Sequence, residues 1–342
     1  METIGEIYLD NAATTPIKKE VLEEMLPFLE KNYGNPSSSH MMGRIARQGI
    51  VQARKSVAHA LGCETDEIYF TSGGTESDNW ALRGCAQHLK KQGKRHIISS
   101  VIEHHAILHA LDILEKEGFE ITRLPVDREG MVQLENLESS IRADTGLITI
   151  MYANNEIGTI QRIKEMVEIA HNHDVLFHTD AVQAVGTVKI DLKKLAVDLL
   201  SFSAHKFNGP KGVGGLYVRR GVLIAPYIAG GMQENGKRAG TENVAGIVGL
   251  AKALELANNL LEEKSQKNIK IRNYMLSRIL CLPKVKLNGS FESRLPSNLN
   301  ITFEGVEGAR LLEVLNQNGI YCSSNVINLS ERKKQIVCFL PF

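Results

Sequence analysis

Lys206 is the residue of this sequence whose surroundings first suggest covalent chemistry. It stands in "SFSAHKFNGPKGVGGLY", where an apolar run ends in Ser-Ala-His-Lys and a turn containing glycine and proline follows. An arbitrary lysine is a solvated surface amine, but a lysine at the buried end of a strand loses hydration and needs a partner. Because a desolvated amine condenses with aldehydes to a Schiff base, we take Lys206 as a candidate nucleophile.

Asp180 ends the apolar run of "HTDAVQAVG", 26 residues before Lys206. Taken alone, this carboxylate is either an ordinary helix N-cap or a buried charge that must meet a cation. A protonated pyridine nitrogen is such a cation, and an acidic residue fills this role beside pyridoxal phosphate. Gln183, three residues further on, could then reach the hydroxyl group of the same ring.

Polar residues follow other apolar runs as well. In "FTSGGTESDNW" two glycines allow a tight turn, and Thr75 opens a helical pattern whose N-terminus suits a phosphate. Glycine-rich turns of this kind are common, and Glu76 and Asp78 fit ordinary capping of the first helical turn. "VIEHHAILHA" adds His104 at a helix start, where a lone histidine is more often structural, and "YANNEIGTIQ" adds paired asparagines.

The composition limits the partners of such a site. The chain has 342 residues, and its 40 basic and 39 acidic side chains nearly cancel, which favours neither nucleic acid nor an anionic membrane. The N-terminus lacks a signal-peptide pattern and no apolar run is long enough to span a membrane, so we expect a cytoplasmic protein. Five scattered cysteines without CxxC spacing predict neither a disulfide framework nor a zinc site.

Strands and helices alternate over residues 66–220. Short, continuously apolar segments such as "EIYFTS", "HIISS", "VLFHTD" and "GGLYVRR" read as strands buried on both faces, and segments such as "HHAILHALDILEKEG" between them read as helices. This order predicts an α/β fold with a mostly parallel sheet between helices. One long helix is expected over residues 243–280, followed by a smaller region with a strand in "LPSNLNITFEG" and a helix in "GARLLEVLNQNG".

The motifs together resemble one family. "YLDNAATTP", "YGNPSSSH", "FTSGGTESDN", "EHHAI", "ANNEIGTIQ", "HTDAVQA", "SFSAHKFNGPKGVGGLYVR" and "GGMQENGKRAGTENV" run in the order found in cysteine desulfurases of the NifS and IscS type, which are class V aminotransferases. The resemblance implies the aspartate-aminotransferase-like fold of pyridoxal-phosphate enzymes. We expect a large domain over residues 16–258 and a small α+β domain built from residues 1–15 and 259–342.

The resemblance also implies a role for each candidate residue. Lys206 would hold pyridoxal 5'-phosphate covalently and then act as acid and base, and His104, the second catalytic residue, would stack on the ring. Asp180 would pair with the ring nitrogen. The other expected cofactor contacts are Gln183, Gly74, Thr75, Asn155, Ser203 and His205, together with Thr241 from a second subunit. A shared site of this kind implies a homodimer, and no metal is expected.

The C-terminal part departs from the family pattern. The family loop resembles "SSGSAC", with the nucleophilic thiol last, whereas here Ser323 and Ser324 are followed by residues that end at Asn328 in the position of the thiol. An amide cannot form a persulfide. Cys322 precedes the loop. Since family members continue beyond the position of Phe342, we expect an incomplete small domain with an uncovered sheet edge.

Three functions follow from these expectations. The first is a cysteine desulfurase, which converts L-cysteine to L-alanine and leaves a persulfide for iron–sulfur or thiolation pathways, with sulfur-acceptor proteins as partners. Its turnover is in question because position 328 carries no thiol. The second is a pyridoxal-phosphate lyase acting on selenocysteine or cysteine sulfinate, which needs no loop thiol. The third is an inactive subunit that serves as a partner or scaffold.

Overall fold

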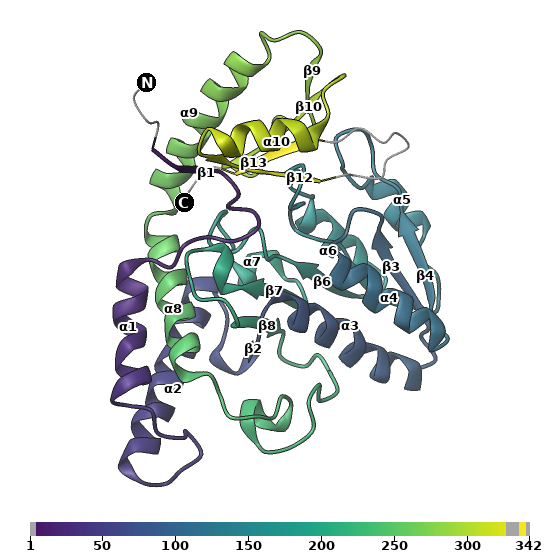
Figure 1. Cartoon of the computed structure of the whole chain (residues 1–342). Coiled ribbons are helices and arrows are strands. Elements are labelled where there is room, and N and C mark those ends of the chain that lie inside the picture. The colour runs from purple at the N-terminus through teal and green to yellow at the C-terminus, as the bar shows by residue number, and fades with distance from the viewer. Residues whose placement is uncertain (1–4, 326–334, 340–342) are drawn as a thin grey trace.

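A mixed seven-stranded sheet forms the centre of the molecule (Figure 1). The computed structural model describes residues 5–325 and 335–339. The strand order is β2-β8-β7-β6-β5-β3-β4, with β2 Ile68–Thr71, β3 His96–Ser100, β4 Glu120–Leu124, β5 Thr145–Thr149, β6 Leu176–Asp180, β7 Leu199–Ser203 and β8 Gly214–Val218. Only β8 runs antiparallel to its neighbours in this sheet. The predicted α/β fold with a mostly parallel sheet is therefore confirmed.

Helices cover both faces of this sheet because successive strand residues point in opposite directions. Ile68 and Phe70 of β2 pack into the core beneath α2, α6 and α8, whereas Tyr69 packs with Trp80 of α3 in the core on the other face. The helices are α1 Lys19–Glu30, α2 Met41–Leu61, α3 Gly74–Lys91, α4 His105–Lys116, α5 Leu134–Ser139, α6 Ile163–Asn172, α7 Leu192–Leu195 and α8 Val244–Asn259. Each strand is thus buried on both sides, as its continuous apolar sequence predicts.

A smaller layer lies over the carboxyl ends of these strands (Figure 1). Its four-stranded sheet has the order β12-β13-β10-β9, and β1 pairs in parallel with β11 beside it. The elements are β1 Ile7–Tyr8, β9 Val285–Leu287, β10 Asn298–Phe303, α10 Gly308–Gln317, β11 Ile320–Tyr321, β12 Ser323–Asn325 and β13 Gln335–Phe339. The proposed domain boundaries at residues 16 and 258 remain a prediction.

An additional strand, β13, extends the small sheet. It pairs antiparallel with β10 over five residue pairs, from Asn298 opposite Phe339 to Thr302 opposite Gln335. β9 and β12 are the edge strands of this sheet, and whether its edge is left uncovered, as expected, stays a prediction. The segment "QIVCF" is rich in residues that favour strands, so it adds to the sheet although its sequence departs from the family pattern. Asn328 lies outside the described residues.

The prediction of a single helix over residues 243–280 is wrong. The structure has two helices, α8 and α9 Leu261–Ile279, separated at Leu260, whose backbone leaves the helical region with ψ near 7°. α8 is buried in the large core and α9 leads to the small layer, so the break redirects the chain. Among the described helices, none alone is long and apolar enough to cross a membrane; α8 and α9 meet that test only together, across a 68° bend.

Two arginine–carboxylate pairs fix the loop that leads into α8. Glu234 lies in the short 3-10 helix η3, Gln233–Gly236, with a left-handed φ of 47°. Its buried carboxylate accepts N–H groups of Arg54 at 2.9 and 2.5 Å and the backbone N–H of Phe70 at 3.0 Å. Arg238 donates to Glu76 at 2.7 and 3.1 Å. The loop is thereby attached to α2 and to the first turn of α3.

Replacing Arg54 tests this attachment. We expect Arg54→Met to lower the free energy of unfolding by about 3 kcal/mol, because it leaves the Glu234 carboxylate buried without its cation. Arg220→Met is the matched control, since the pair of Arg220 with Asp66 is exposed and contributes far less. Denaturant unfolding of both variants measures the difference. Equal losses for the two variants would contradict the assignment.

Candidate active site

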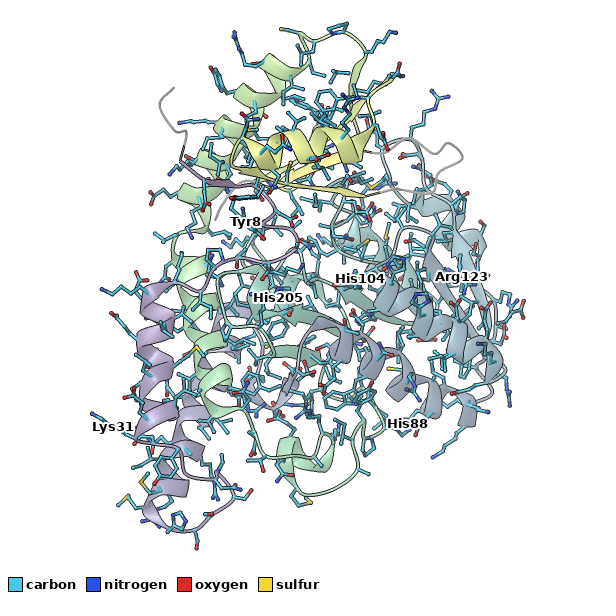
Figure 2. The ribbon with its side chains drawn as sticks, viewed as in Figure 1. Tyr8, Lys31, His88, His104, Arg123 and His205 are labelled. Atoms are coloured by element: carbon cyan, nitrogen blue, oxygen red, sulfur yellow. The ribbon has the colours of Figure 1, made fainter. Side chains whose placement is uncertain are left out.

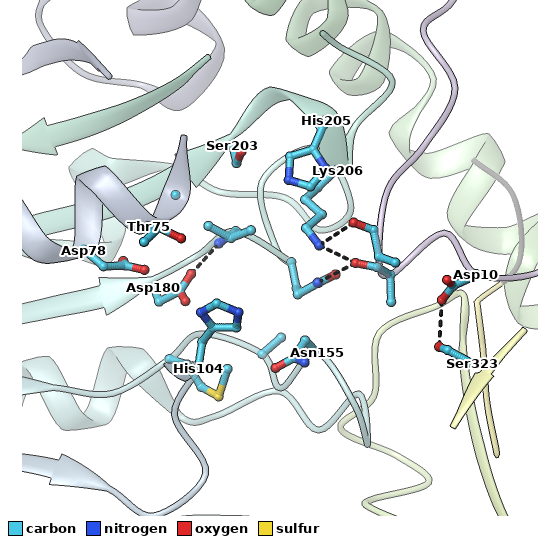
Figure 3. A pocket seen from close by; sticks show the side chains of 17 residues that line it. Asp10, Thr75, Asp78, His104, Asn155, Asp180, Ser203, His205, Lys206 and Ser323 are labelled. Atoms are coloured by element: carbon cyan, nitrogen blue, oxygen red, sulfur yellow. Dashed lines mark hydrogen bonds between the residues drawn. The ribbon is translucent and has the colours of Figure 1, made fainter. Parts of the chain in front are cut away.

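A cavity of about 400 Å³ lies at the carboxyl ends of the central strands, below the small layer (Figure 3). Open α/β sheets bind their ligands at this edge. Nine of the ten candidate residues line it: Lys206, His104, Gly74, Thr75, Asn155, Asp180, Gln183, Ser203 and His205. His104 and His205, which are 101 positions apart in the sequence, thus line the same cavity (Figure 2).

Lys206 reaches the cavity from η2, Ala204–Lys206, directly after β7. Its Nζ donates hydrogen bonds to the carbonyl oxygens of Ala12 and, at 3.1 Å, Ala13. Burial lowers the pKa of Lys206 to about 8, although the negative charges of Asp180 and Asp10 partly oppose this shift. A substantial fraction of the amine is therefore neutral near physiological pH, which a nucleophilic amine requires.

The N-terminal segment of residues 10–16 holds the turn that carries Lys206. The backbone N–H of Thr15 donates to the carbonyl oxygen of His205 at 2.9 Å, and the Thr14 hydroxyl lies 3.2 Å from the His205 ring. Gln183 donates to the Ala12 carbonyl oxygen at 3.2 Å. No residue of this segment was among the expected site residues. The only sequence signal for it is the motif "YLDNAATTP", whose small residues suit close packing around the lysine.

Asp180 and His104 lie next to each other in the cavity, with a carboxylate oxygen and a ring nitrogen within 4.8 Å (Figure 3). Asp180 ends β6 and accepts the backbone N–H of Val182 at 2.9 Å. Burial raises the pKa of Asp180, and the nearby His104 and Lys206 act in the opposite direction. His104 caps α4 by accepting the N–H of Ala106 on Nδ1 at 3.1 Å, and burial lowers the pKa of its ring. The ring is therefore a neutral, flat surface beside the carboxylate.

The start of α3 forms the far end of the cavity. Gly73 adopts a φ of 156° before the helix, a conformation that side chains rarely allow. A Cβ atom on Gly74 would lie 2.6 Å from a methyl group of Val182, so only glycine lets these segments approach. The first turn of a helix has N–H groups without partners in the helix, and Thr75, Ser203 and His205 surround it here. This end of the cavity suits an anion such as phosphate.

Other residues are placed differently from the expectation or were not assigned by it. Thr241 is exposed on the loop before α8 and does not line the cavity of its own chain. Cys322 is half-buried beside Ser323, and only Ser323 lines the cavity, donating to Asp10 at 2.7 Å. Asp78 also lines the cavity, although its sequence position suggested only capping.

Comparison with known proteins supports the same assignment. Residues 7–325 match the family model described as aminotransferase class-V. A cysteine desulfurase IscS from Methanosarcina thermophila is 56% identical over 318 residues, which cover 93% of this chain and 78% of the relative.

Solved structures agree with this match. A "NifS-like protein" superposes with a TM-score of 0.94 at 42% identity, covering 98% of this chain and 94% of the other. A structure titled "SspA in complex with cysteine" has a TM-score of 0.85 at 34% identity and covers 98% and 99% of the two chains. The chain therefore belongs to the class V aminotransferases and, within them, to the cysteine desulfurases.

Proposed function

We propose that this cysteine desulfurase holds pyridoxal 5'-phosphate on Lys206 and uses it to remove the sulfur atom of L-cysteine, leaving L-alanine. The observation that carries the proposal is the shared cavity, in which the half-buried amine of Lys206 and the buried carboxylate of Asp180 lie near a helix N-terminus. The amine can react with an aldehyde, the carboxylate can pair with a pyridine nitrogen, and the helix N-terminus can bind a phosphate. Pyridoxal 5'-phosphate carries an aldehyde, a pyridine nitrogen and a phosphate. The enzymes of this family depend on the same cofactor.

Each lining residue has a proposed task. Asp180 would pair with the ring nitrogen, Gln183 would contact the ring oxygen, and the neutral ring of His104 would stack on the cofactor. The phosphate would lie at the first turn of α3, which begins with Gly74 and Thr75, beside the side chains of Ser203 and His205. Asn155, on the loop after β5, would face the bound substrate.

The chemistry then depends on proton transfer by Lys206. When bound, pyridoxal phosphate withdraws electrons from the substrate's α carbon. The Nζ of Lys206, released from the cofactor, would take and return the proton at that carbon, a role that its lowered pKa suits. The carbonyl oxygens of Ala12 and Ala13 would keep the amine directed into the cavity.

The sulfur needs a thiol acceptor. In the balanced reaction, the carbon–sulfur bond of cysteine breaks, the sulfur joins a thiol R–SH to give R–S–SH, and alanine is the other product. None of the cysteines within residues 5–325 lines the cavity, and position 328, where the family carries its thiol, is asparagine. We therefore propose that the acceptor is a separate thiol, such as that of a sulfur-acceptor protein in iron–sulfur or thiolation pathways.

The structure of a relative with bound cysteine supports this substrate. No observation favours the alternatives, a lyase for selenocysteine or cysteine sulfinate and an inactive subunit. The exposed position of Thr241 agrees with a homodimer in which it contacts the partner's cofactor. The cytoplasmic location and the absence of a metal remain predictions from the sequence.

The pH dependence of cofactor attachment tests the role of Lys206. Below pH 8 the neutral fraction of this amine falls about tenfold per pH unit, so covalent attachment of pyridoxal phosphate should slow by that factor and level off above pH 8. Borohydride reduction followed by mass spectrometry measures the attachment. Lys206→Ala should abolish it, and Lys211→Ala, at an exposed neighbouring lysine, should not change it. A rate that still rises at pH 10 would contradict the proposal.

The source of the acceptor thiol gives a second test. We expect added dithiothreitol to increase alanine formation from cysteine by about tenfold or more, because the chain places no described cysteine at the cavity. Cys322→Ala should leave the rate in the presence of this thiol within about twofold of wild type, like the control Cys281→Ala at an exposed site. A protein persulfide that forms in wild type and is missing in Cys322→Ala would show that Cys322 is the acceptor.

A further inference from the structure

Asp78 is a buried carboxyl group to which the mechanism above assigns no task. It lies near the N-terminal end of α3 and lines the cavity beside Asp180 (Figure 3). The residue is 1% exposed, and within the described part of the chain its Oδ1 has no hydrogen-bond partner. An ionised carboxylate in this situation loses its hydration without compensation. The protonation state of Asp78 therefore needs an explanation.

A row of polar side chains lies between Asp78 and the sheet. Thr149 of β5, His178 of β6 and Ser201 of β7 stand side by side, with the two hydroxyl oxygens 2.8 and 3.0 Å from the ring nitrogens of His178. Oδ1 of Asp78 lies 3.8 Å from Nε2 of His178, and the neighbouring Ser201 hydroxyl only partly opposes the rise in the pKa of Asp78 that burial causes. Burial lowers the pKa of His178 to about 3, so its ring is neutral and supplies no positive charge to Asp78.

The charged groups near Asp78 favour its protonated form, whereas those near Asp180 favour the ionised form. One oxygen of Asp78, one oxygen of Asp180 and one ring nitrogen of His104 lie within 4.8 Å of one another. Asp180 and, from the segment after β3, Glu103 raise the pKa of Asp78 further above the value that burial alone gives. Lys206 instead favours the ionised form of Asp180. Two neighbouring buried carboxyl groups do not both ionise. Asp180 is the one that the positive charge of Lys206 stabilises, so Asp78 is the one that stays protonated.

We propose that Asp78 keeps its proton at neutral pH and is a positioning residue that acts through Asp180. Its neutral carboxyl group leaves Asp180 as the charged carboxylate opposite Lys206, and a second negative charge is kept away from that pair. The pairing of the charged Asp180 with the ring nitrogen of the cofactor rests on the proposed function. The protonation of Asp78 does not depend on that function, so the two parts are tested separately.

Unfolding of the cofactor-free protein at several pH values tests the protonation. The folded chain keeps a proton that Asp78 releases on unfolding, so stability falls as the pH rises above the usual range of aspartate. The unfolding equilibrium constant of wild type, divided by that of Asp78→Asn, should rise about tenfold per pH unit between about pH 5 and 7. A constant or falling ratio overturns the proposal.

Asp198→Asn is the matched control for removing a buried carboxyl group. Asp198 is as buried as Asp78 but contacts the guanidinium of Arg219 and lies 2.9 Å from the ring of His171. The ratio for Asp78→Asn should rise more steeply over this pH range than the corresponding ratio for Asp198→Asn, because Asp198 has a cationic partner in Arg219 and Asp78 has none among the described residues. A rise of the same size would show that the effect does not come from the environment of Asp78, and would overturn the proposal.

Infrared spectra keep the proposal testable if Asp78→Asn does not fold. Wild-type protein carrying aspartate labelled with ¹³C at the side-chain carboxyl carbon should show the C=O stretch of a protonated aspartic acid at neutral pH. The label separates this band from that of Glu103, whose pKa burial raises to about 8. The band should persist in Asp180→Asn. Its absence from wild type, or its loss in Asp180→Asn, overturns the proposal.

Titration with pyridoxal phosphate tests the link to Asp180. Asp78→Asn keeps a neutral hydrogen-bonding group and should bind with a Kd within about threefold of wild type, whereas Asp78→Ala should bind about tenfold more weakly. Equal weakening in Asp78→Asn and Asp180→Asn overturns the positioning role. If wild type binds no pyridoxal phosphate, the proposed function fails, and the pH-dependent unfolding still decides the protonation of Asp78.

Discussion

The attraction between the half-buried amine of Lys206 and the buried carboxylate of Asp180 at one edge of the sheet is the constraint on which the site depends. Burial disfavours the charged forms of both Lys206 and Asp180, and each partly offsets the shift in the other. The sheet brings them together because β6 and β7 are neighbouring parallel strands, with Asp180 opposite Ser201. Residues that follow the two strands must then emerge at the same edge. The amine and the carboxylate are separated by the space that a ligand can fill.

Segments far away in the sequence complete this arrangement. The carbonyl oxygens of Ala12 and Ala13 fix the lysine amine, and the small layer above contributes Ser323 through its bond to Asp10. On the opposite side, Arg238 holds the first turn of α3 by its pair with Glu76. The site is thus assembled from the N-terminus, the large sheet and the region after residue 320, so its geometry depends on the complete fold of these parts.

The interior beneath the site is polar as well. On the face of the sheet that α3 covers, three neighbouring strands carry the polar side chains of Thr149, His178 and Ser201. Both ring nitrogens of His178 are hydrogen-bonded to the neutral hydroxyl groups of the other two residues. A neutral layer of this kind does not compete with Asp180 for the positive charge of Lys206. The same low-dielectric surroundings make any additional charge costly, which connects the state of Asp78 to that of Asp180.

The sequence by itself determined the alternation of strands and helices and the candidate residues at the strand ends. Continuous apolar runs, glycine turns and the family motifs are local signals, and nine of the ten residues chosen from them line one cavity. The break at Leu260 and the pairing of β13 with β10 were not predicted. The break interrupts a continuous helical pattern, and the pairing depends on which strand lies beside the strand-favouring residues of β13, which local sequence does not show. The roles of Ala12, Ala13 and Asp78 were decided only by the tertiary structure. Backbone carbonyl groups carry no sequence signal, and the charge of a carboxyl group depends on burial and on neighbours that come from other strands.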